Sequence, residues 1–188
     1  MREHPLICSD EVVRAILAGK QTQDRRPIKL KTEWGVPVRA GETMVVGNIL
    51  GRFRAWPREE PGDLLYVREA WARIGDPPGE MHYRAAGNGE PDNAFVGEHG
   101  GWHPSIHMPK QIARTWLRVT RAWVERLQDI DEDGCRAEGC ADWPAFADLW
   151  NGIYEGRGLG WAANPWVRCC EFTVASRTGR AGVEESTQ

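Results

Sequence analysis

Apolar residues recur at helical spacing near the start of the chain, at Val12, Val13, Ile16 and Leu17. This spacing predicts a helix over residues 10–18 with one buried face. Gly19 follows, where a helix C-cap needs a residue that tolerates a positive φ. Pro27 prevents the helix from resuming, so residues 20–26, which are all polar, are expected on a constrained and exposed loop.

Strand patterns follow in the middle of the chain. Between residues 28 and 58, short β-like pieces alternate with glycines, which predicts a β-meander with tight turns. Residues 64–71 (LLYVREAW) carry the strongest strand pattern, and alternation along it directs Glu69 and Trp71 to the same side. Residues 114–126 alternate well enough to form a long strand.

Two helices and a further strand are expected in the last third, over residues 131–139, 143–154 and 166–174. Residues 176–188 are polar and are expected to form a disordered tail. Residues 75–104 are rich in Gly, Pro, Asn and Asp, which predicts a long surface insertion that could act as a lid. Together these elements predict an α+β protein with a single domain over residues 1–175.

The bulk composition indicates a soluble domain. The chain has 188 residues, of which 41% are hydrophobic and 27% charged, as is ordinary for a globular protein. No apolar run is long enough to cross a bilayer, and the N-terminus lacks the apolar segment of a secretion signal. Five cysteines cannot all pair within the chain, which favours a reducing compartment. We therefore expect a cytoplasmic protein with no membrane partner.

Charge and aromatic content limit the possible nucleic-acid contacts. A net charge of −3 argues against a protein that coats nucleic acid through bulk electrostatics. A local basic patch remains open, because six basic residues fall close together in sequence: Lys20, Arg25, Arg26, Lys29, Lys31 and Arg39. The ten tryptophans can fill a core or stack on bases, and Trp71, Trp102 and Trp116 are the candidates for stacking.

A metal site can be drawn from four residues, His103, His107, Cys135 and Cys140. Pro104 breaks any helix that would align the two histidines, and C-x4-C spacing is looser than in common structural zinc sites. We expect no metal and no cofactor. Cys169 and Cys170 are adjacent in a predicted strand and so face opposite ways, which indicates buried and inert thiols.

Six stretches, taken together, carry a family resemblance: VVRAILAGKQTQDRRPIK, GDLLYVREAW, PSIHMP, VERLQDI, AEG and NPWV. In this order they resemble the ASCH domains of the PUA-like superfamily, in particular the phage and prophage branch, over nearly the whole chain from Leu6 to Val174. The resemblance implies a small mixed β-barrel with flanking helices and a cleft beside the first helix, here with a long loop insertion.

The amidohydrolase members of this family hydrolyse acetylcytidine with a lysine and a threonine from the motif G-x-K-T-x-T-x-R and a later glutamate. Three positions of the motif match here, Gly19, Thr22 and Arg26, and Glu138 matches the glutamate. Gln21 stands in place of the lysine and Asp24 in place of the threonine nucleophile. A glutamine amide cannot accept a proton from a hydroxyl nucleophile, so the inherited mechanism is expected to be disabled.

The first functional hypothesis is a nucleic-acid or modified-nucleoside binding module, whose cleft accepts a nucleobase or nucleoside, expected to be modified, free or from RNA or DNA. Phosphate would be held by Lys20, Arg25 and Arg26. The base edge would be hydrogen-bonded by Gln21, Asp24 and Glu138, with Trp71 stacking on the base. The remaining expected pocket residues are Thr22, Glu69, Ser105 and His107.

Two alternatives stay open. An amidohydrolase acting on acylated cytidine could use a rearranged catalytic set of Lys20, Asp24 and Glu138. A phage-type protein could instead block a host protein through residues 75–103. Asp24 and Glu138 could equally pair with Arg25 and Arg26 as a structural ion network. The sequence does not indicate an oligomeric state.

Overall fold

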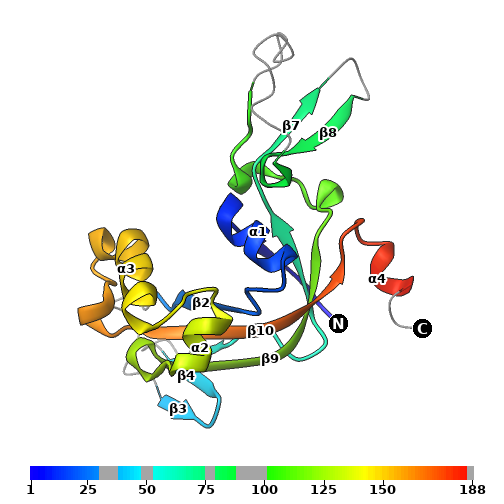
Figure 1. Cartoon of the computed structure of the whole chain (residues 1–188). Coiled ribbons are helices and arrows are strands. Elements are labelled where there is room, and N and C mark those ends of the chain that lie inside the picture. The colour runs from blue at the N-terminus through cyan, green and yellow to red at the C-terminus, as the bar shows by residue number, and fades with distance from the viewer. Residues whose placement is uncertain (30–37, 48–52, 75–78, 88–100, 186–188) are drawn as a thin grey trace. The chain divides into compact units, whose positions relative to one another are not determined.

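The computed structural model describes residues 1–29, 38–47, 53–74, 79–87 and 101–185 (Figure 1). The chain divides into two compact units, where its length had predicted a single domain. Unit 1 comprises residues 1–19, 63–118 and 174–188, and unit 2 comprises residues 20–62 and 119–173. The chain passes between them inside two long strands, β9 (Trp116–Arg126) and β10 (Trp166–Ser176).

Unit 1 contains four complete strands: β1 (Glu3–Ile7), β6 (Leu64–Arg68), β7 (Trp71–Ile74) and β8 (Glu80–Tyr83). Strand β6 is central, since it pairs in parallel with β1 and antiparallel with residues 116–118 of β9. Strands β7 and β8 form an antiparallel hairpin, which Figure 1 shows as a projecting ribbon. The predicted insertion therefore begins as a hairpin, and residues 75–78 and 88–100 lie outside the described part of the chain.

The helices of unit 1 are α1 (Asp10–Leu17), α4 (Gly182–Glu185) and the 3-10 turns η1 (Arg84–Ala86), η2 (Ser105–His107) and η3 (Lys110–Ile112). The predicted first helix is confirmed. Ser9 Oγ accepts a hydrogen bond from Val12 N at 3.4 Å, and Gly19 leaves the helix with φ +70°. Val13 and Ile16 are its buried face.

One core cluster of unit 1 includes a residue, Val183, from the segment expected to be a disordered tail. The cluster consists of Leu64, Met108, Ala113, Trp116, Ala175 and Val183. Val183 on α4 is only 2% exposed, and Thr178 N donates to Ser176 Oγ at 3.1 Å. Residues 176–185 are thus folded, held by Val183 and by hydrogen bonds from Gly179 N to Arg114 O at 2.8 Å and from Arg180 Nε to Glu3 Oε1 at 2.7 Å.

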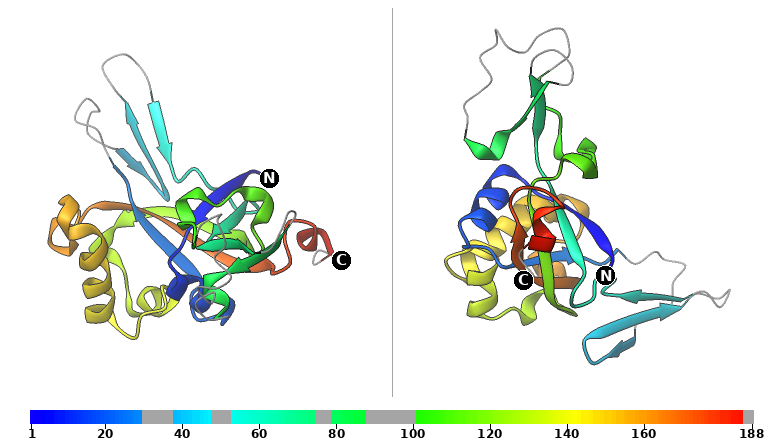
Figure 2. Two further views of the ribbon diagram at one scale, coloured as in Figure 1. Left: turned by 90° about the horizontal axis from the view of Figure 1, so that it is seen from above. Right: turned by 90° about the vertical axis from the view of Figure 1, so that its right-hand side faces the viewer.

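Among the described residues, the strands of unit 2 fall into two groups of three. The first has the order β9-β10-β2, in which β2 (Gln23–Pro27) runs antiparallel to β10. The second is the meander of β3 (Val38–Ala40), β4 (Thr43–Gly47) and β5 (Phe53–Trp56), visible as a separate ribbon in Figure 2. The predicted meander is confirmed in kind.

The helices of unit 2 are α2 (Glu132–Ala137), α3 (Trp143–Tyr154) and the 3-10 turns η4 (Leu127–Asp129), η5 (Glu155–Arg157) and η6 (Trp161–Ala163). Phe146, Trp150 and Tyr154 from α3 pack with Trp123 of β9 and Cys169 of β10 in one core. A second core joins Ile28, Met44, Val46, Trp56 and Val124. The tryptophans Trp123, Trp150 and Trp56 are therefore core residues, as expected for most of the ten.

The predicted β-barrel is wrong for the part of the chain that the structure describes. Each sheet there is open: β1 ends the sheet of unit 1, and β2 ends the first sheet of unit 2, each with one ladder partner. A barrel requires that no strand be left at an edge. The described residues form a mixed α+β structure with open sheets, and none of their helices is long and apolar enough to cross a membrane.

Candidate functional site

Arg25 lies at the centre of a buried polar network in unit 2. Its side chain is 3% exposed and leaves strand β2. Its Nε donates to Glu125 Oε1 at 2.8 Å, and its Nη1 donates to Glu138 Oε1 at 3.0 Å. Nη1 also donates to Gln23 Oε1 at 2.9 Å. Two carboxylates and an amide therefore surround one guanidinium group, and strands β2 and β9 and helix α2 each contribute.

The segment that contains Arg25 is a strand and not the expected exposed loop. Pairing with β10 gives it its backbone partners, with Arg25 opposite Cys169 and Asp24 opposite Cys170. Gln21, Asp24 and Arg25 are each 6% exposed. A run of polar residues can form a buried strand when each charged side chain meets an opposite charge inside the protein.

Helix α2 is fixed against this strand. Thr22 N donates to Ala137 O at 2.8 Å, and Phe172 N donates to Thr22 O at 2.9 Å. Gly134 allows the close approach, since a Cβ there would lie 2.8 Å from Ile130 Cγ1 and 3.0 Å from Arg25 Nη2. Gly139 leaves the helix with φ +81°, directly after Glu138.

Gln21 and Glu138 lie together, as the resemblance implied for the lysine and glutamate positions. Gln21 Nε2 is 3.5 Å from Glu138 Oε2 and donates to Gln23 O at 3.1 Å. Burial, and after it the nearby charge of Asp24, raises the pKa of Glu138 to about 8, although Arg25 lowers it in part. The pair is well placed for hydrogen bonding, whereas Gln21 offers no base.

Asp24 and Arg26 point to the other face of β2, because successive residues of a strand alternate. Arg26 Nε donates to both Asp24 oxygens, at 3.0 and 2.9 Å. Asp24 is thereby engaged as an ion-pair partner at the position where the family has a nucleophile. Lys20, the last member of the rearranged catalytic set, is exposed.

A polar groove with a volume of about 520 Å³ opens over the Arg25 network. Its charged lining residues are Arg25, Glu42, Arg121, Glu125, Asp129, Asp131, Asp133 and Glu171. Trp123 forms part of the wall, with its Nε1 donating to Glu125 Oε2 at 2.7 Å and the Arg121 guanidinium 4.7 Å from its ring centroid. We call this hollow the Arg25 groove.

The other expected site residues belong to unit 1. Glu69 is fully buried, and Arg114 Nε and Nη2 donate to its two oxygens at 2.9 and 2.8 Å. The Arg114 guanidinium also lies 4.5 Å from the Tyr83 ring centroid. Glu69 is therefore committed to an ion pair, and Arg114 is a partner that no sequence pattern indicated.

Trp71 stacks on a neighbouring side chain. Its ring centroid is 4.4 Å from that of His103, with the two planes 26° apart. One face of the indole is therefore covered. Ser105 is half-buried and His107 exposed, both on the turn η2. The structure thus places four expected site residues in unit 1, and Lys20, Gln21, Thr22, Asp24, Arg25, Arg26 and Glu138 in unit 2.

Sequence reasoning missed Trp123, Glu125 and Gln23, which complete the site around Arg25. Alternation along the predicted strand over residues 114–126 places Trp123 and Glu125 on one face, which was the available signal. That pattern does not indicate Arg25, which is the partner of Glu125 and lies 100 residues away in sequence. The predicted contact of Arg25 with phosphate would have to displace one of its carboxylates.

The residues weighed as zinc ligands do not form one cluster. His103 and His107 belong to unit 1, and Cys135 and Cys140 to unit 2. Within the described ranges, no group of three or more His, Cys, Asp or Glu side chains is placed to hold a metal. The adjacent thiols Cys169 and Cys170 are buried, and burial raises the pKa of Cys170 to about 12.

No known protein family and no curated protein matches the sequence. Among solved structures, the chain is similar to protein EF3133 from Enterococcus faecalis V583, of the family DUF984. The two share 9% identity with a TM-score of 0.46, over 94% of this chain and 82% of that chain. A similarity this low supports no conclusion about activity.

Proposed function

We propose that the protein is a binding module for a nucleobase or nucleoside, and that the Arg25 groove is where the base is recognised. The observation that carries the proposal is a buried guanidinium, held by Glu125 and Glu138, at the floor of a polar groove of about 520 Å³. A small planar polar ligand is the class that such a hollow fits, because its fixed donors and acceptors can each meet one edge atom.

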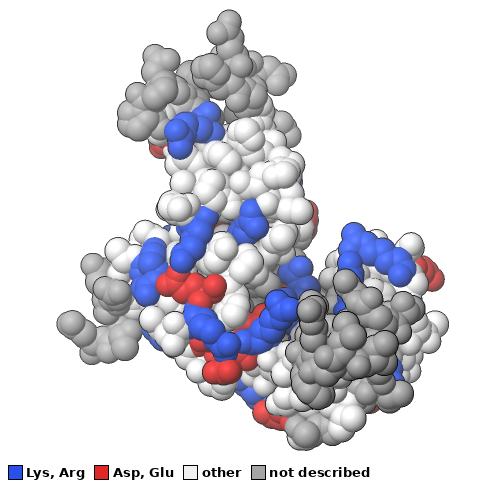
Figure 3. Space-filling model, turned by 180° about the vertical axis from the view of Figure 1, so that it is seen from behind, with Lys and Arg blue, Asp and Glu red and all other residues white. Residues whose placement is uncertain are grey.

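The lining chemistry favours the base over the phosphate. Six carboxylates and two guanidinium groups line the groove, which would repel a phosphate group. Carboxylates accept hydrogen bonds from amino groups such as those of cytosine and adenine. On the face shown in Figure 3, Lys and Arg side chains lie beside Asp and Glu side chains.

Binding is favoured over hydrolysis by the state of the proposed catalytic groups. Asp24 accepts from Arg26, and Glu138 accepts from Arg25, so both carboxylates serve as ion-pair or hydrogen-bond partners. Gln21 occupies the lysine position and cannot act as a base. The resemblance to ASCH domains supports the same ligand class, because a nucleoside is what its amidohydrolase members act on. The proposal places the protein in the cytoplasm, where its five free thiols would persist.

Calorimetric titration with cytidine, acetylcytidine, adenosine, guanosine and uridine tests the proposal. We expect cytidine or adenosine to bind more tightly than uridine, whose pairing edge carries carbonyl oxygens where these bases carry amino groups. Glu171→Gln should weaken binding by about tenfold, since a hydrogen bond to a charged group is worth roughly 1.5 kcal/mol or more. Glu155→Gln changes an exposed carboxylate outside the groove and should have no effect. Folded protein that gives no heat with any nucleoside would overturn the proposal.

A further inference from the structure

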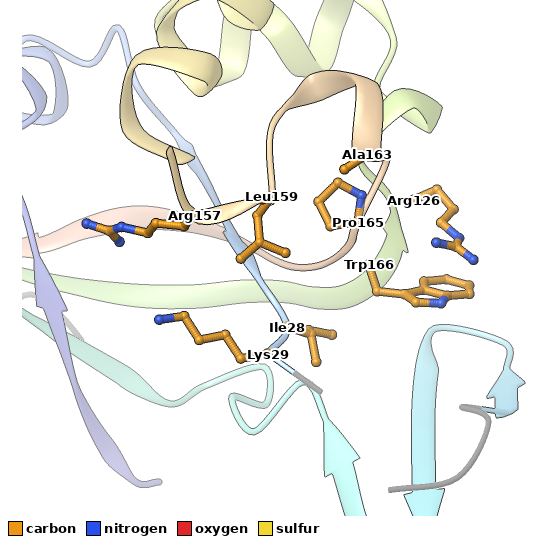
Figure 4. A pocket seen from close by; sticks show the side chains of 9 residues that line it. Ile28, Lys29, Arg126, Arg157, Leu159, Ala163, Pro165 and Trp166 are labelled. Carbon is orange, nitrogen blue, oxygen red and sulfur yellow. The ribbon is translucent and has the colours of Figure 1, made fainter. Parts of the chain in front are cut away.

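A second hollow in unit 2 has the opposite charge to the Arg25 groove. It has a volume of about 560 Å³ and is lined by Ile28, Lys29, Arg126, Arg157, Gly158, Leu159, Ala163, Pro165 and Trp166. Three of these nine residues are basic and none is acidic. We call it the basic hollow, and Figure 4 shows its side chains.

The two hollows are separate. Glu125 lines the Arg25 groove and Arg126 lines the basic hollow, and adjacent residues of a strand face opposite sides. Arg25 on strand β2 borders the Arg25 groove and not the basic hollow. Ile28, which follows the strand, borders the basic hollow and not the groove. A ligand in the basic hollow therefore meets a set of side chains that the proposed base site does not use.

Arg126 is held in a fixed orientation. Its guanidinium carbon lies 4.5 Å from the Trp166 ring centroid, and its Nη1 donates to Asn164 O at 3.0 Å. Trp166 in turn packs against the core around Val124. A guanidinium that lies over an indole can accept a second planar group such as a base on its outer face.

Lys29 and Arg157 supply positive charge at the end of the basic hollow away from Arg126 (Figure 4). Figure 4 shows their side chains on one side of the hollow and Arg126 with Trp166 on the other, with Leu159 and Ile28 between them. Both cations are exposed, and none of the ion pairs among the described residues involves them. The acidic groups nearest to these cations in sequence are Glu125 and Asp129, which line the Arg25 groove, and the exposed Glu155 of η5. Asp129 accepts from Arg126 N.

We propose that the basic hollow binds a nucleoside phosphate, either a free nucleotide or a unit of a nucleic-acid strand. The phosphate would lie between Lys29 and Arg157, whose donors and positive charges suit its oxygens. The sugar or base would lie along Leu159 and Ile28 toward the outer face of Arg126. This site goes beyond the proposed nucleoside groove and adds the phosphate contact that the acidic groove does not offer.

The test measures binding of AMP, inorganic phosphate and a fluorescently labelled ten-nucleotide single strand by the full chain. We expect Lys29→Gln together with Arg157→Gln to weaken AMP and the strand by about tenfold or more. The salt dependence of strand binding should also fall, by about 1.4 in the slope of log K against log salt, for two lost phosphate contacts. Both residues are exposed, so the double variant should remain folded.

Two further variants separate the contributions. Arg136→Gln removes an exposed charge of α2 that lines neither hollow and should change nothing. Arg126→Lys keeps the charge but loses the planar group, so it should weaken AMP and leave inorganic phosphate unchanged. Binding of the strand alone, without AMP, would identify a nucleic-acid strand as the source of the phosphate.

Three results would overturn the proposal. The first is equal affinity of the wild type and the Lys29/Arg157 double variant. The second is that neither AMP nor the strand binds, and the third is that inorganic phosphate binds as tightly as AMP. Uncharged nucleosides, titrated in parallel, report on the Arg25 groove alone. Failure of the basic hollow is therefore distinguishable from failure of the proposed nucleoside function.

Discussion

Arg25 Nη1 donates to Glu138 Oε1 at 3.0 Å, across 113 residues of sequence. The contact joins the strand after the first helix to the end of α2, the two segments that the family resemblance had linked as parts of one site. Glu138 nevertheless pairs with the guanidinium of Arg25 and the amide of Gln21, and not with a lysine. These two segments form a buried hydrogen-bond network here.

Removal of Arg25 should destabilise unit 2 strongly. Arg25→Met would leave Glu125, Glu138 and Gln23 without their shared donor, and breaking a buried ion pair in this way costs about 3 kcal/mol or more. The free energy of unfolding in urea measures this. Arg136→Met removes only exposed pairs and should cost less than about 1 kcal/mol. Equal effects of the two substitutions would contradict the network.

Stability should depend on pH through Glu138. Burial raises its pKa from an ordinary value of 4.5 to about 8, so the folded state keeps a proton that the unfolded chain releases. This contribution to stability is fully present below about pH 4.5 and is lost as the pH rises through about 8. Glu138→Gln cannot titrate, so wild-type stability should fall relative to that variant between pH 5 and 9. If the free energy of unfolding in urea changes with pH in the same way for the wild type and for Glu138→Gln, then Glu138 is ionised in the folded state over this whole pH range.

Wild-type protein should release no cytidine from acetylcytidine. Gln21 cannot accept a proton, and Asp24 is held by Arg26. Replacing Gln21 with Lys and Asp24 with Thr introduces the two residues that the resemblance implies at these positions, and we expect that double variant to gain activity. Chromatography of the reaction mixture measures the release of cytidine by the wild type and by the double variant. Circular dichroism checks that both proteins are folded. Hydrolysis by the wild type would favour the rearranged catalytic set with Lys20.

The sequence predicted the regular elements better than the site. Periodicity located α1, α3, β9 and β10, because apolar residues alone decide which face of each element is buried. It failed for β2, whose sequence QDRRP has no apolar residue except proline. That segment is a strand because it pairs with β10 and because Arg25 meets the carboxylates of Glu125 and Glu138 from remote parts of the chain. A pattern along one segment carries no information about such partners.

The expected fold failed for a related reason. Motif order supported a barrel, but closure depends on whether the edge strands β1 and β2 find a second partner, which no local motif encodes. The site residues show the same limit. Residues 64–71 were predicted as one strand, but β6 ends at Arg68 and β7 begins at Trp71, so Glu69 lies between two strands. The contacts of Glu69 and Trp71 are made by Arg114 and His103, which are remote in sequence.

Gly134 offers the sharpest test of how tightly the network is packed. Alanine normally stabilises a helix relative to glycine by about 0.5–1 kcal/mol. At Gly134, however, a Cβ would lie 2.8 Å from Ile130 Cγ1, 3.0 Å from Arg25 Nη2 and 3.1 Å from Asp131 Oδ1, and overpacking costs about 1–3 kcal/mol.

We therefore expect Gly134→Ala to lower the free energy of unfolding and to weaken nucleoside binding, because Arg25 must move away from the added methyl group. Gly152→Ala in α3 is the matched control, since a Cβ there meets nothing within 4 Å, and it should be neutral or stabilising. Urea unfolding and calorimetric titration of both variants measure the contrast. If both alanines stabilise the protein equally, helix α2 does not press on Arg25, and the floor of the groove is looser than these distances indicate.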